Sequence, residues 1–428
     1  LFILLRSDCA YKMLGKNIRL CLNLKSLNPK NLGSSVNFCS SYSTDKTSSS
    51  PPSSDLLASL NLARYARGTG GRSSVNGNVV TVFGATGMMG RIICNRLGKE
   101  GSQMILPTRG DLWSARGIKL TGDLGQVIFL DYDLRDDEKI RQAVQYSNVV
   151  INCIGADYET SNFSYHDVHV DGPRRLARIS KECGVEKFIH FSALNASPNP
   201  QKIFLKPSEF LISKYEGEEA VRDEFENAVI IRPSNIYGES DRFLYYYIND
   251  LRRNVSSIPL WKKGEMTIKM PVHQRDVADG VMKIMNNKDI KGATYDFVGP
   301  DRYLLSEIVD YIYQLLQRPN IRRSHLTPAR LGMVYLYEKV MKRPQFSLDL
   351  FEREFISDQL SSDSRNPTLK DLGLELRKFD ESVAWCLKVF NKLSYYNEKL
   401  NEFPEPKPPK PLSDDFEYQL RRKIRQTQ

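Results

Sequence analysis

Short apolar runs alternate with amphipathic segments along the chain up to Gly299. The first run, Val79–Phe83, precedes a segment that places Met89, Ile93 and Leu97 on one side of a helix. Further strands are expected at 103–107, 127–130, 148–154, 187–191 and 228–231, with helices at 138–146, 172–183 and 207–225. Continuous apolar runs are typical of parallel strands that are buried on both faces. The pattern predicts an α/β fold with a doubly wound parallel sheet of the Rossmann type.

The pattern changes beyond Gly299, where amphipathic helices are expected at 304–316, 328–341 and 348–359 without intervening strands. These helices predict a smaller, mainly helical part packed on the sheet domain. Residues 404–411 hold five prolines and are expected to be an extended linker. The predicted organisation is therefore a presequence and linker at 1–54, a Rossmann domain at 55–300, a helical part at 301–400 and a Pro-rich, basic tail at 401–428.

Three glycines spaced G-x-x-G-x-x-G stand between the first strand and the first helix. In a dinucleotide site, Gly84 allows a sharp turn, Gly87 lets the backbone approach the pyrophosphate, and Gly90 lets the helix pack closely on the strand. The start of the helix offers unpaired N–H groups to the anion. A glycine-rich turn without a ligand is the alternative. The context favours a cofactor site, with candidate residues Gly84, Ala85, Thr86, Gly87, Met88, Met89 and Gly90.

In a doubly wound sheet, ligands bind at the carboxyl ends of the strands. The further candidates at these ends are Arg109, Asp133, Leu134, Ile154, Gly155, Ser192 and Pro233. Arg109 follows the second strand, where NAD-binding proteins usually carry an acidic residue for the ribose 2′-OH. A guanidinium there can pair with a 2′-phosphate, which favours NADP(H). The alternative is that Asp111 binds the ribose and Arg109 is only an exposed side chain.

The composition of the chain also indicates where the protein is targeted. The chain has 428 residues and a net charge of +10, and it contains no uninterrupted apolar run of membrane-spanning length. Residues 9–44 contain no Asp or Glu but five Lys or Arg residues, which is typical of an organellar transit peptide. Scattered cysteines suit free thiols, and the pair His166 and His169 is expected on the surface rather than at a metal. Neither end interleaves basic and aromatic residues, so no nucleic-acid partner is expected.

The glycine turn, Ser192 and the R-P-x-x-I-Y-G stretch at 232–238 resemble the extended and atypical short-chain dehydrogenase/reductases. Within that superfamily, the chain resembles the NADPH-binding accessory subunits of mitochondrial NADH:ubiquinone oxidoreductase (complex I) over roughly residues 65–390. The stretches that carry this resemblance are 71–75, 122–126, 147–152, 184–190 and 297–300. The resemblance implies a location on the matrix side of the inner membrane, a structural role, and other complex I subunits as partners. The basic stretch 421–425 is either a solvated tail or a contact for a partner or anionic lipid.

The superfamily's chemistry uses a Ser, a Lys and a Tyr four residues before that Lys, with the Tyr exchanging a proton with the substrate. Ser192 and Lys214 are present here, but the tyrosine position holds Phe210, whose ring has no proton to give. Tyr215 directly follows Lys214 and projects about 100° away around the helix. No catalytic residue is therefore assigned, and Lys214 is expected to bind the nicotinamide ribose. Two alternatives remain: an active reductase or epimerase that uses another proton donor, and a regulator whose partner binding depends on NADPH.

Overall fold

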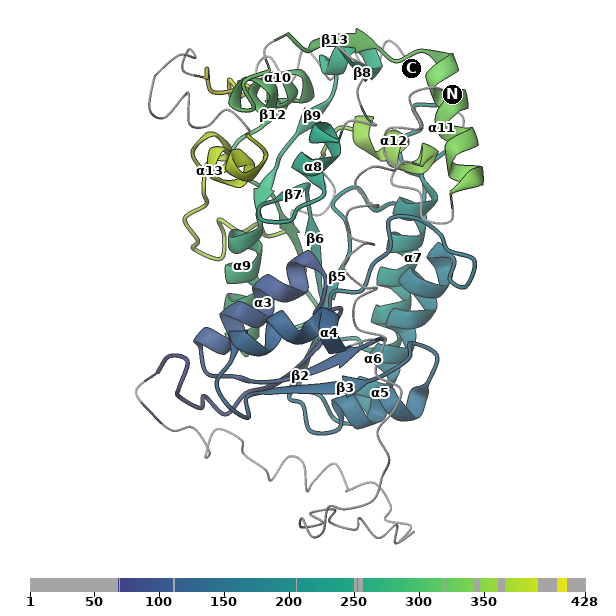
Figure 1. Cartoon of the computed structure of the whole chain (residues 1–428). Helices are drawn as coiled ribbons and strands as arrows, with labels where there is room; N and C mark the ends of the chain where they lie inside the picture. Colours follow the sequence, from purple (N-terminus) through teal and green to yellow (C-terminus); the bar gives the residue numbers. More distant parts are fainter. Residues whose placement is uncertain are drawn as a thin grey trace, which may run out of the picture. The chain divides into compact units, whose positions relative to one another are not determined.

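Figure 1 shows the chain as a computed structural model. The structure describes residues 68–413 except 69, 111, 205, 250–251, 253–256, 319, 342–346, 361–365 and 392–405. The predictions for the presequence at 1–54 and for the basic stretch 421–425 lie outside these residues. Within the predicted linker, residues 406–411 form no helix or strand.

Seven parallel strands form the central sheet, in the order β11-β6-β5-β4-β1-β2-β3. Their bounds are β1 Val79–Phe83, β2 Gln103–Thr108, β3 Val127–Asp131, β4 Val149–Asn152, β5 Lys187–Phe191, β6 Val229–Pro233 and β11 Thr294–Phe297. Val80 of the central strand pairs with Met104 on one side and Val149 on the other. All six predicted strands are confirmed, and β11 adds a seventh at the edge.

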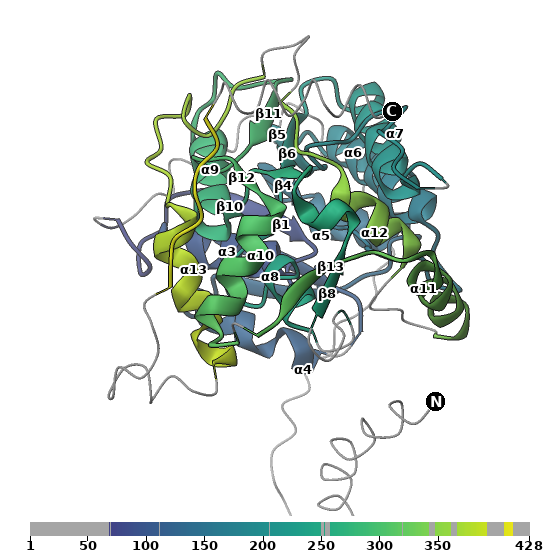
Figure 2. The same cartoon turned by 90° about the horizontal axis from the view of Figure 1, so that it is seen from above.

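Helices cover both faces of this sheet, as Figure 2 shows from above. One face packs on α3 (Met88–Lys99) and α9 (Gln274–Asn286), and the other on α5 (Asp137–Val144), α6 (Gly172–Glu182) and α7 (Glu209–Glu224). Because alternate strand residues face opposite ways, Val80 and Val82 join the first layer while Phe83 and Val150 join the second. The doubly wound α/β fold is therefore confirmed.

A second hydrophobic core lies beyond the carboxyl ends of the strands, at the top of Figure 1. Its later segments are α10 (Leu305–Leu315), α11 (Pro328–Val340), α12 (Leu348–Phe355) and α13 (Phe379–Leu387). Its earlier segments are β7 (Ile236–Tyr237), α8 (Phe243–Ile248) and β8 (Ser257–Leu260). The two cores therefore do not divide at residue 300, where the sequence placed a boundary, because Tyr237, Leu244, Tyr247, Ile258 and Leu260 are buried with residues after 300.

Two details of the expected helical part are wrong. Strand β13 (Arg322–His325) lies between α10 and α11 and pairs in parallel with β8, whereas no strand was expected there. Helix α12 ends at Phe355 instead of continuing to 359. The chain there turns to β9 (Ile268–Lys269), where the Asp358 N–H donates to the Ile268 carbonyl oxygen at 2.9 Å. Beyond these elements, β10 (Val272–His273) pairs with β7, and β12 (Tyr303–Leu304) pairs with β9.

Candidate nucleotide-binding site

The glycine turn between β1 and α3 has the geometry that a pyrophosphate requires. Gly84 adopts a φ of +79°, and a Cβ there would lie 2.9 Å from the Cys153 backbone that follows β4. A Cβ on Gly90 would lie 2.3 Å from the Gly84 carbonyl oxygen, so any side chain would push α3 off the strand. The Gly87 N–H donates to the Gly84 carbonyl oxygen at 3.0 Å, and Gly87 begins the helix without a side-chain cap. The first N–H groups of α3 are therefore free of a side-chain cap.

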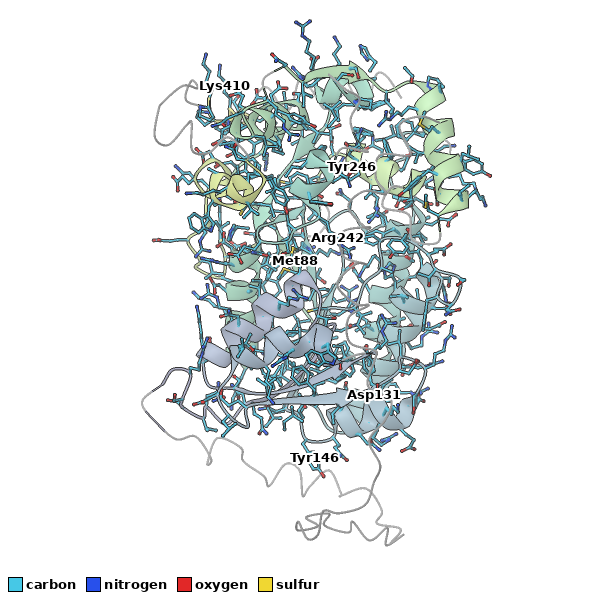
Figure 3. The ribbon with its side chains drawn as sticks, in the orientation of Figure 1. Met88, Asp131, Tyr146, Arg242, Tyr246 and Lys410 are labelled. Atoms are coloured by element: carbon cyan, nitrogen blue, oxygen red, sulfur yellow. The ribbon has the colours of Figure 1, made fainter. Side chains whose placement is uncertain are left out.

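The other members of the turn differ in exposure. Ala85 and Met89 are buried in the first core, whereas Thr86 is exposed and Met88, labelled in Figure 3, is half-buried at the start of α3. The turn is closed on its outer side by Arg91, whose Nε donates to the Thr86 carbonyl oxygen at 3.0 Å. Backbone atoms rather than side chains therefore line the turn at Gly84 and Gly87.

At the end of β2, Arg109 is exposed and its guanidinium lies 5.6 Å from the Phe163 ring centroid. Arg135 stacks on the same ring at 4.4 Å and also donates to the Asn162 carbonyl oxygen at 2.7 Å. Thr108, the last residue of β2, has a buried Oγ1 without a hydrogen-bond partner among the described residues. Asp111, the alternative ribose ligand, lies outside the described residues.

The loop after β3 places its two candidates differently. Asp133 is exposed, and its Oδ1 accepts a hydrogen bond from the Arg135 N–H at 2.9 Å. Leu134 is buried, and its Cδ2 is so near that a Cβ on Gly172 of α6 would lie 2.8 Å from it. Asp133 therefore shapes the loop while Leu134 anchors it to the second face of the sheet.

Ser192, Lys214 and Gly155 come together at the ends of β4 and β5. The Lys214 Nζ donates to the Phe191 carbonyl oxygen at 3.1 Å, and a Cβ on Gly155 would lie 3.5 Å from that Nζ. Ile154, just before, is buried and donates its N–H to the Asn152 Oδ1 at 3.0 Å. Burial lowers the pKa of Lys214 to about 8. The Ser192 Oγ is buried and has no hydrogen-bond partner among the described residues.

Pro233, at the end of β6, supports this cluster through its backbone. Its carbonyl oxygen accepts a hydrogen bond from the Leu194 N–H at 3.0 Å, which ties the loop after β5 to β6. The neighbouring Arg232 forms an ion pair of 2.6 Å with Glu218, a fully buried residue of α7. The β5 and β6 ends and the helix that carries Lys214 are thereby held together.

Phe210 lies on α7 one turn before Lys214 and is enclosed by residues that the sequence reasoning missed. His169 and Tyr165 contact its ring edge-on, with centroid separations of 5.1 and 6.1 Å. Arg353 of α12 places its guanidinium carbon 3.9 Å from the ring centroid. The spacing of Phe210, Ser213 and Gly217 on one face of α7 is the sequence signal that something packs closely there.

The prediction that His166 and His169 are both surface residues is wrong for His169. Its ring is buried, its Nε2 accepts a hydrogen bond from the Ala156 N–H at 3.1 Å, and its Nδ1 lies 2.9 Å from the Ser213 Oγ. Burial lowers the pKa of His169 to about 2. The cause is a π-helical turn, η3 (Asp167–Asp171), that approaches α7 at Gly217, where a Cβ would lie 2.0 Å from the His169 carbonyl oxygen. His166 is exposed as predicted and pairs with Asp171 at 3.3 Å.

The described residues fit a dinucleotide cofactor. The turn at Gly84 and Gly87 has free backbone surface at a helix start, which suits a pyrophosphate. The orphaned hydroxyls of Thr108, at the end of β2, and Ser192, just after β5, both lie at the carboxyl-end edge of the sheet, where polar ligand groups are expected. Within the described part of the chain, no group of three or more His, Cys, Asp and Glu side chains is arranged to hold a metal ion.

These features define a Rossmann protein with a nucleotide-binding turn. The sequence model of the NAD dependent epimerase/dehydratase family matches residues 80–297, and the chain belongs to this family. The fold agrees with dTDP-glucose 4,6-dehydratase from Streptomyces venezuelae, solved with NAD bound, at a TM-score of 0.54 and 15% identity, covering 77% of this chain and all of that one.

More similar sequences come from mitochondrial proteins. The chain is 42% identical over 359 residues to NADH dehydrogenase [ubiquinone] 1 alpha subcomplex subunit 9, mitochondrial, of Rattus norvegicus, covering 83% of this chain and 90% of that protein. It is 35% identical over 335 residues to the NADH-ubiquinone oxidoreductase 40 kDa subunit, mitochondrial, of Neurospora crassa, covering 77% of this chain and 84% of that protein.

Within the described residues, no helix combines the length and the apolar character needed to cross a bilayer.

Proposed function

We propose that this chain is a non-catalytic accessory subunit of mitochondrial complex I that binds NADPH and stabilises the matrix arm. The observation that carries the proposal is the 42% identity to the rat protein, a relative named as a subunit of that enzyme, over 90% of its length. The location that follows is the matrix side of the inner membrane, with other complex I subunits as partners. The acid-free, basic segment at 9–44 supports import into mitochondria.

NADPH rather than NADH is the proposed ligand. Arg109 follows β2 and stacks loosely on Phe163, and no ion pair engages its guanidinium among the described residues. A cation that is not already neutralised suits a 2′-phosphate. The turn from Gly84 to Gly90 would hold the pyrophosphate, while Ser192, Lys214 and Gly155 would lie toward the nicotinamide ribose. When bound, the cofactor supplies a hydride donor.

The role of the bound nucleotide is structural. Phe210 in the tyrosine position leaves the retained Ser192 and Lys214 without a proton donor. Its aromatic neighbours do not replace it: burial lowers the pKa of His169 to about 2, and the Tyr165 hydroxyl donates to the Asp157 carbonyl oxygen at 2.8 Å. A ligand that binds only the folded chain stabilises it by about 3–4 kcal/mol at roughly 100–1,000 times its Kd.

The test combines assembly, ligand and turnover. Mitochondria would be fractionated on native gels, and the chain is expected in the megadalton band that oxidises NADH. Nucleotide released from the purified chain is expected to be NADPH. The chain is expected not to oxidise it with a panel of aldehydes and ketones. Steady turnover would contradict the silent role and support an active reductase, whereas exchange between bound and free pools as NADPH/NADP changes would support a regulator.

A further inference from the structure

The ring of Phe210 is covered on its face by an arginine from the second core. The guanidinium carbon of Arg353 lies 3.9 Å from the ring centroid, and the Arg353 side chain is only 13% exposed. In the superfamily that the chain resembles, the residue at this position touches the substrate. The space over this ring is therefore the space that a substrate must enter.

Arg353 is held in place by carboxylates rather than lying loosely over the ring. Its Nε forms an ion pair of 3.1 Å with Asp349 of the same helix, and its Nη1 lies 3.7 Å from the Asp157 Oδ1. Its Nη2 also donates to the Asp157 carbonyl oxygen at 3.3 Å. Two carboxylates already balance its charge, so Arg353 is not a vacant cation that awaits an acidic substrate.

The helix that carries Arg353 is fastened on both sides of it. Glu352 accepts hydrogen bonds from the backbone N–H groups of Ile203 and Phe204, the latter at 3.0 Å. Glu354 pairs with the buried Arg252 at 2.8 Å and accepts a hydrogen bond from the Tyr246 hydroxyl at 2.7 Å. Three consecutive residues of α12 therefore hold three different loops, which makes the helix a fixed cover.

We propose that Arg353 fills the substrate position beside residue 210, so that this chain has lost its substrate site as well as its proton donor. The inference rests on the proposed silent function and adds a second block to it. Loss of the phenol alone would leave an open pocket. With Arg353 in place, α12 closes that side, while the glycine turn at the start of α3 remains open to the nucleotide.

The test measures access to position 210 in the full-length chain by thiol labelling. Phe210→Cys is treated with iodoacetamide, and labelled peptides are located by mass, which separates this site from the native cysteines. We expect slow labelling in the folded chain and labelling about tenfold faster in Phe210→Cys/Arg353→Ala, because thiol reactivity follows access. The matched control is Phe210→Cys/Arg242→Ala. Arg242 pairs with the same Asp157, but its side chain is 75% exposed, so its removal is expected to leave the rate unchanged.

Equal rates in the Arg353→Ala and Arg242→Ala backgrounds would overturn the proposal. If Arg353→Ala does not fold, Phe210→Cys alone decides: labelling as fast in the folded chain as in denaturant would mean that nothing covers the site. The rates need neither nucleotide nor partner subunits. A chain that fails to bind NADPH but protects position 210 would therefore remove the proposed function and keep the closed substrate position.

Discussion

Gly84, Gly87 and Gly90 are spaced alike in the sequence, yet the fold requires only two of them. Gly84 has a positive φ, and a Cβ on Gly90 would overlap the Gly84 carbonyl oxygen. Gly87 has a φ of −71°, and a Cβ there would meet only that oxygen, at 3.3 Å. The fold does not require glycine at position 87, so the missing side chain there is explained by space for a ligand. This distinction depends on backbone angles, which the spacing of glycines does not reveal.

The first prediction separates ligand binding from folding within this turn. Gly87→Val is expected to abolish NADPH binding while changing the stability of the nucleotide-free chain by less than about 1 kcal/mol. Gly90→Val is expected to cost about 3 kcal/mol, the upper end of the usual range for overpacking, because its side chain would overlap the backbone of the turn. Titration calorimetry and denaturant unfolding measure the two effects. Tight NADPH binding by Gly87→Val would show that the pyrophosphate lies elsewhere.

A second residue-scale prediction concerns cofactor choice. Arg109→Glu is expected to remove the preference for NADPH over NADH, because an anion would face the 2′-phosphate in place of a cation. The loss is about 1.5–3 kcal/mol of binding free energy for NADPH. The control is Arg135→Glu, which changes the other cation on Phe163 and is expected to retain the preference. If both variants lose the preference for NADPH equally, the positive potential of the whole region selects the cofactor, and Arg109 has no specific role.

Lys214 makes stability depend on pH in a defined direction. Burial lowers its pKa from 10.5 to about 8, so between these pH values the unfolded chain binds a proton that the folded chain has released. Stability therefore rises with pH through this window, by at most about 3 kcal/mol, and the cost is constant below it. The free energy of unfolding of nucleotide-free wild type minus that of Lys214→Met would be measured across the window. A flat difference would mean that the pKa of Lys214 is not lowered.

At the scale of elements, the apolar periodicity predicted the strands of the central sheet and missed elements that carry no apolar pattern. Strands β1 to β6 each contain at least three apolar residues (Val, Ile, Leu, Met or Phe), and they form where expected. Strand β13 reads Arg-Arg-Ser-His, so it carries no apolar signal, and among the described strands it pairs with β8 alone. The π-helical turn that buries His169 depends on the close approach allowed by Gly217, which is a tertiary contact. Arg353 was also missed because its place over Phe210 is a tertiary contact between distant parts of the chain.

The buried pair between Arg252 and Glu354 allows a prediction for α12. Both side chains are almost fully buried, and the Arg252 guanidinium also lies over the Phe351 ring at 4.7 Å. Glu354→Ala is expected to cost about 3–5 kcal/mol, because it leaves a buried charge without its partner. Glu182→Ala, which breaks the exposed Arg141–Glu182 pair, is the control and is expected to cost less than about 1 kcal/mol. Similar losses in denaturant unfolding would mean that the pair does not anchor α12.

At the scale of the whole molecule, the sequence predicted one sheet domain and a smaller part after it. The structure interleaves them: β7, α8 and β8 contribute to the second core, α9 and β11 return to the sheet, and the chain then leaves again for α10. Apolar patterns mark which residues are buried but not with which partners they are buried. A boundary drawn at a change of pattern therefore separated segments that share one core.

A truncated chain tests this interleaving. Residues 1–300 are expected to be insoluble or rapidly digested by protease, because Tyr237, Tyr247 and Ile258 would lose the helices that cover them. The matched comparison is a chain that ends at residue 391, which retains α13 and is expected to remain folded. Circular dichroism and limited proteolysis measure the outcome. A stable, protease-resistant 1–300 fragment would mean that the sheet domain needs no second core.

The interleaved core also sets an order of events when the chain is made or threaded across a membrane with its N-terminus first. The segment from β7 to β8 emerges before α10, α11, α12 and α13, which complete the core that buries it. The apolar residues of this segment stay exposed until about a hundred further residues have been made, and such delays favour aggregation and chaperone binding. Nucleotide can stabilise the first half of the sheet during this interval, because the glycine turn is complete as soon as β1, α3 and β4 have met. Because the β7–β8 segment precedes the helices of the second core, nucleotide bound at the glycine turn would stabilise the sheet while the second core is still incomplete.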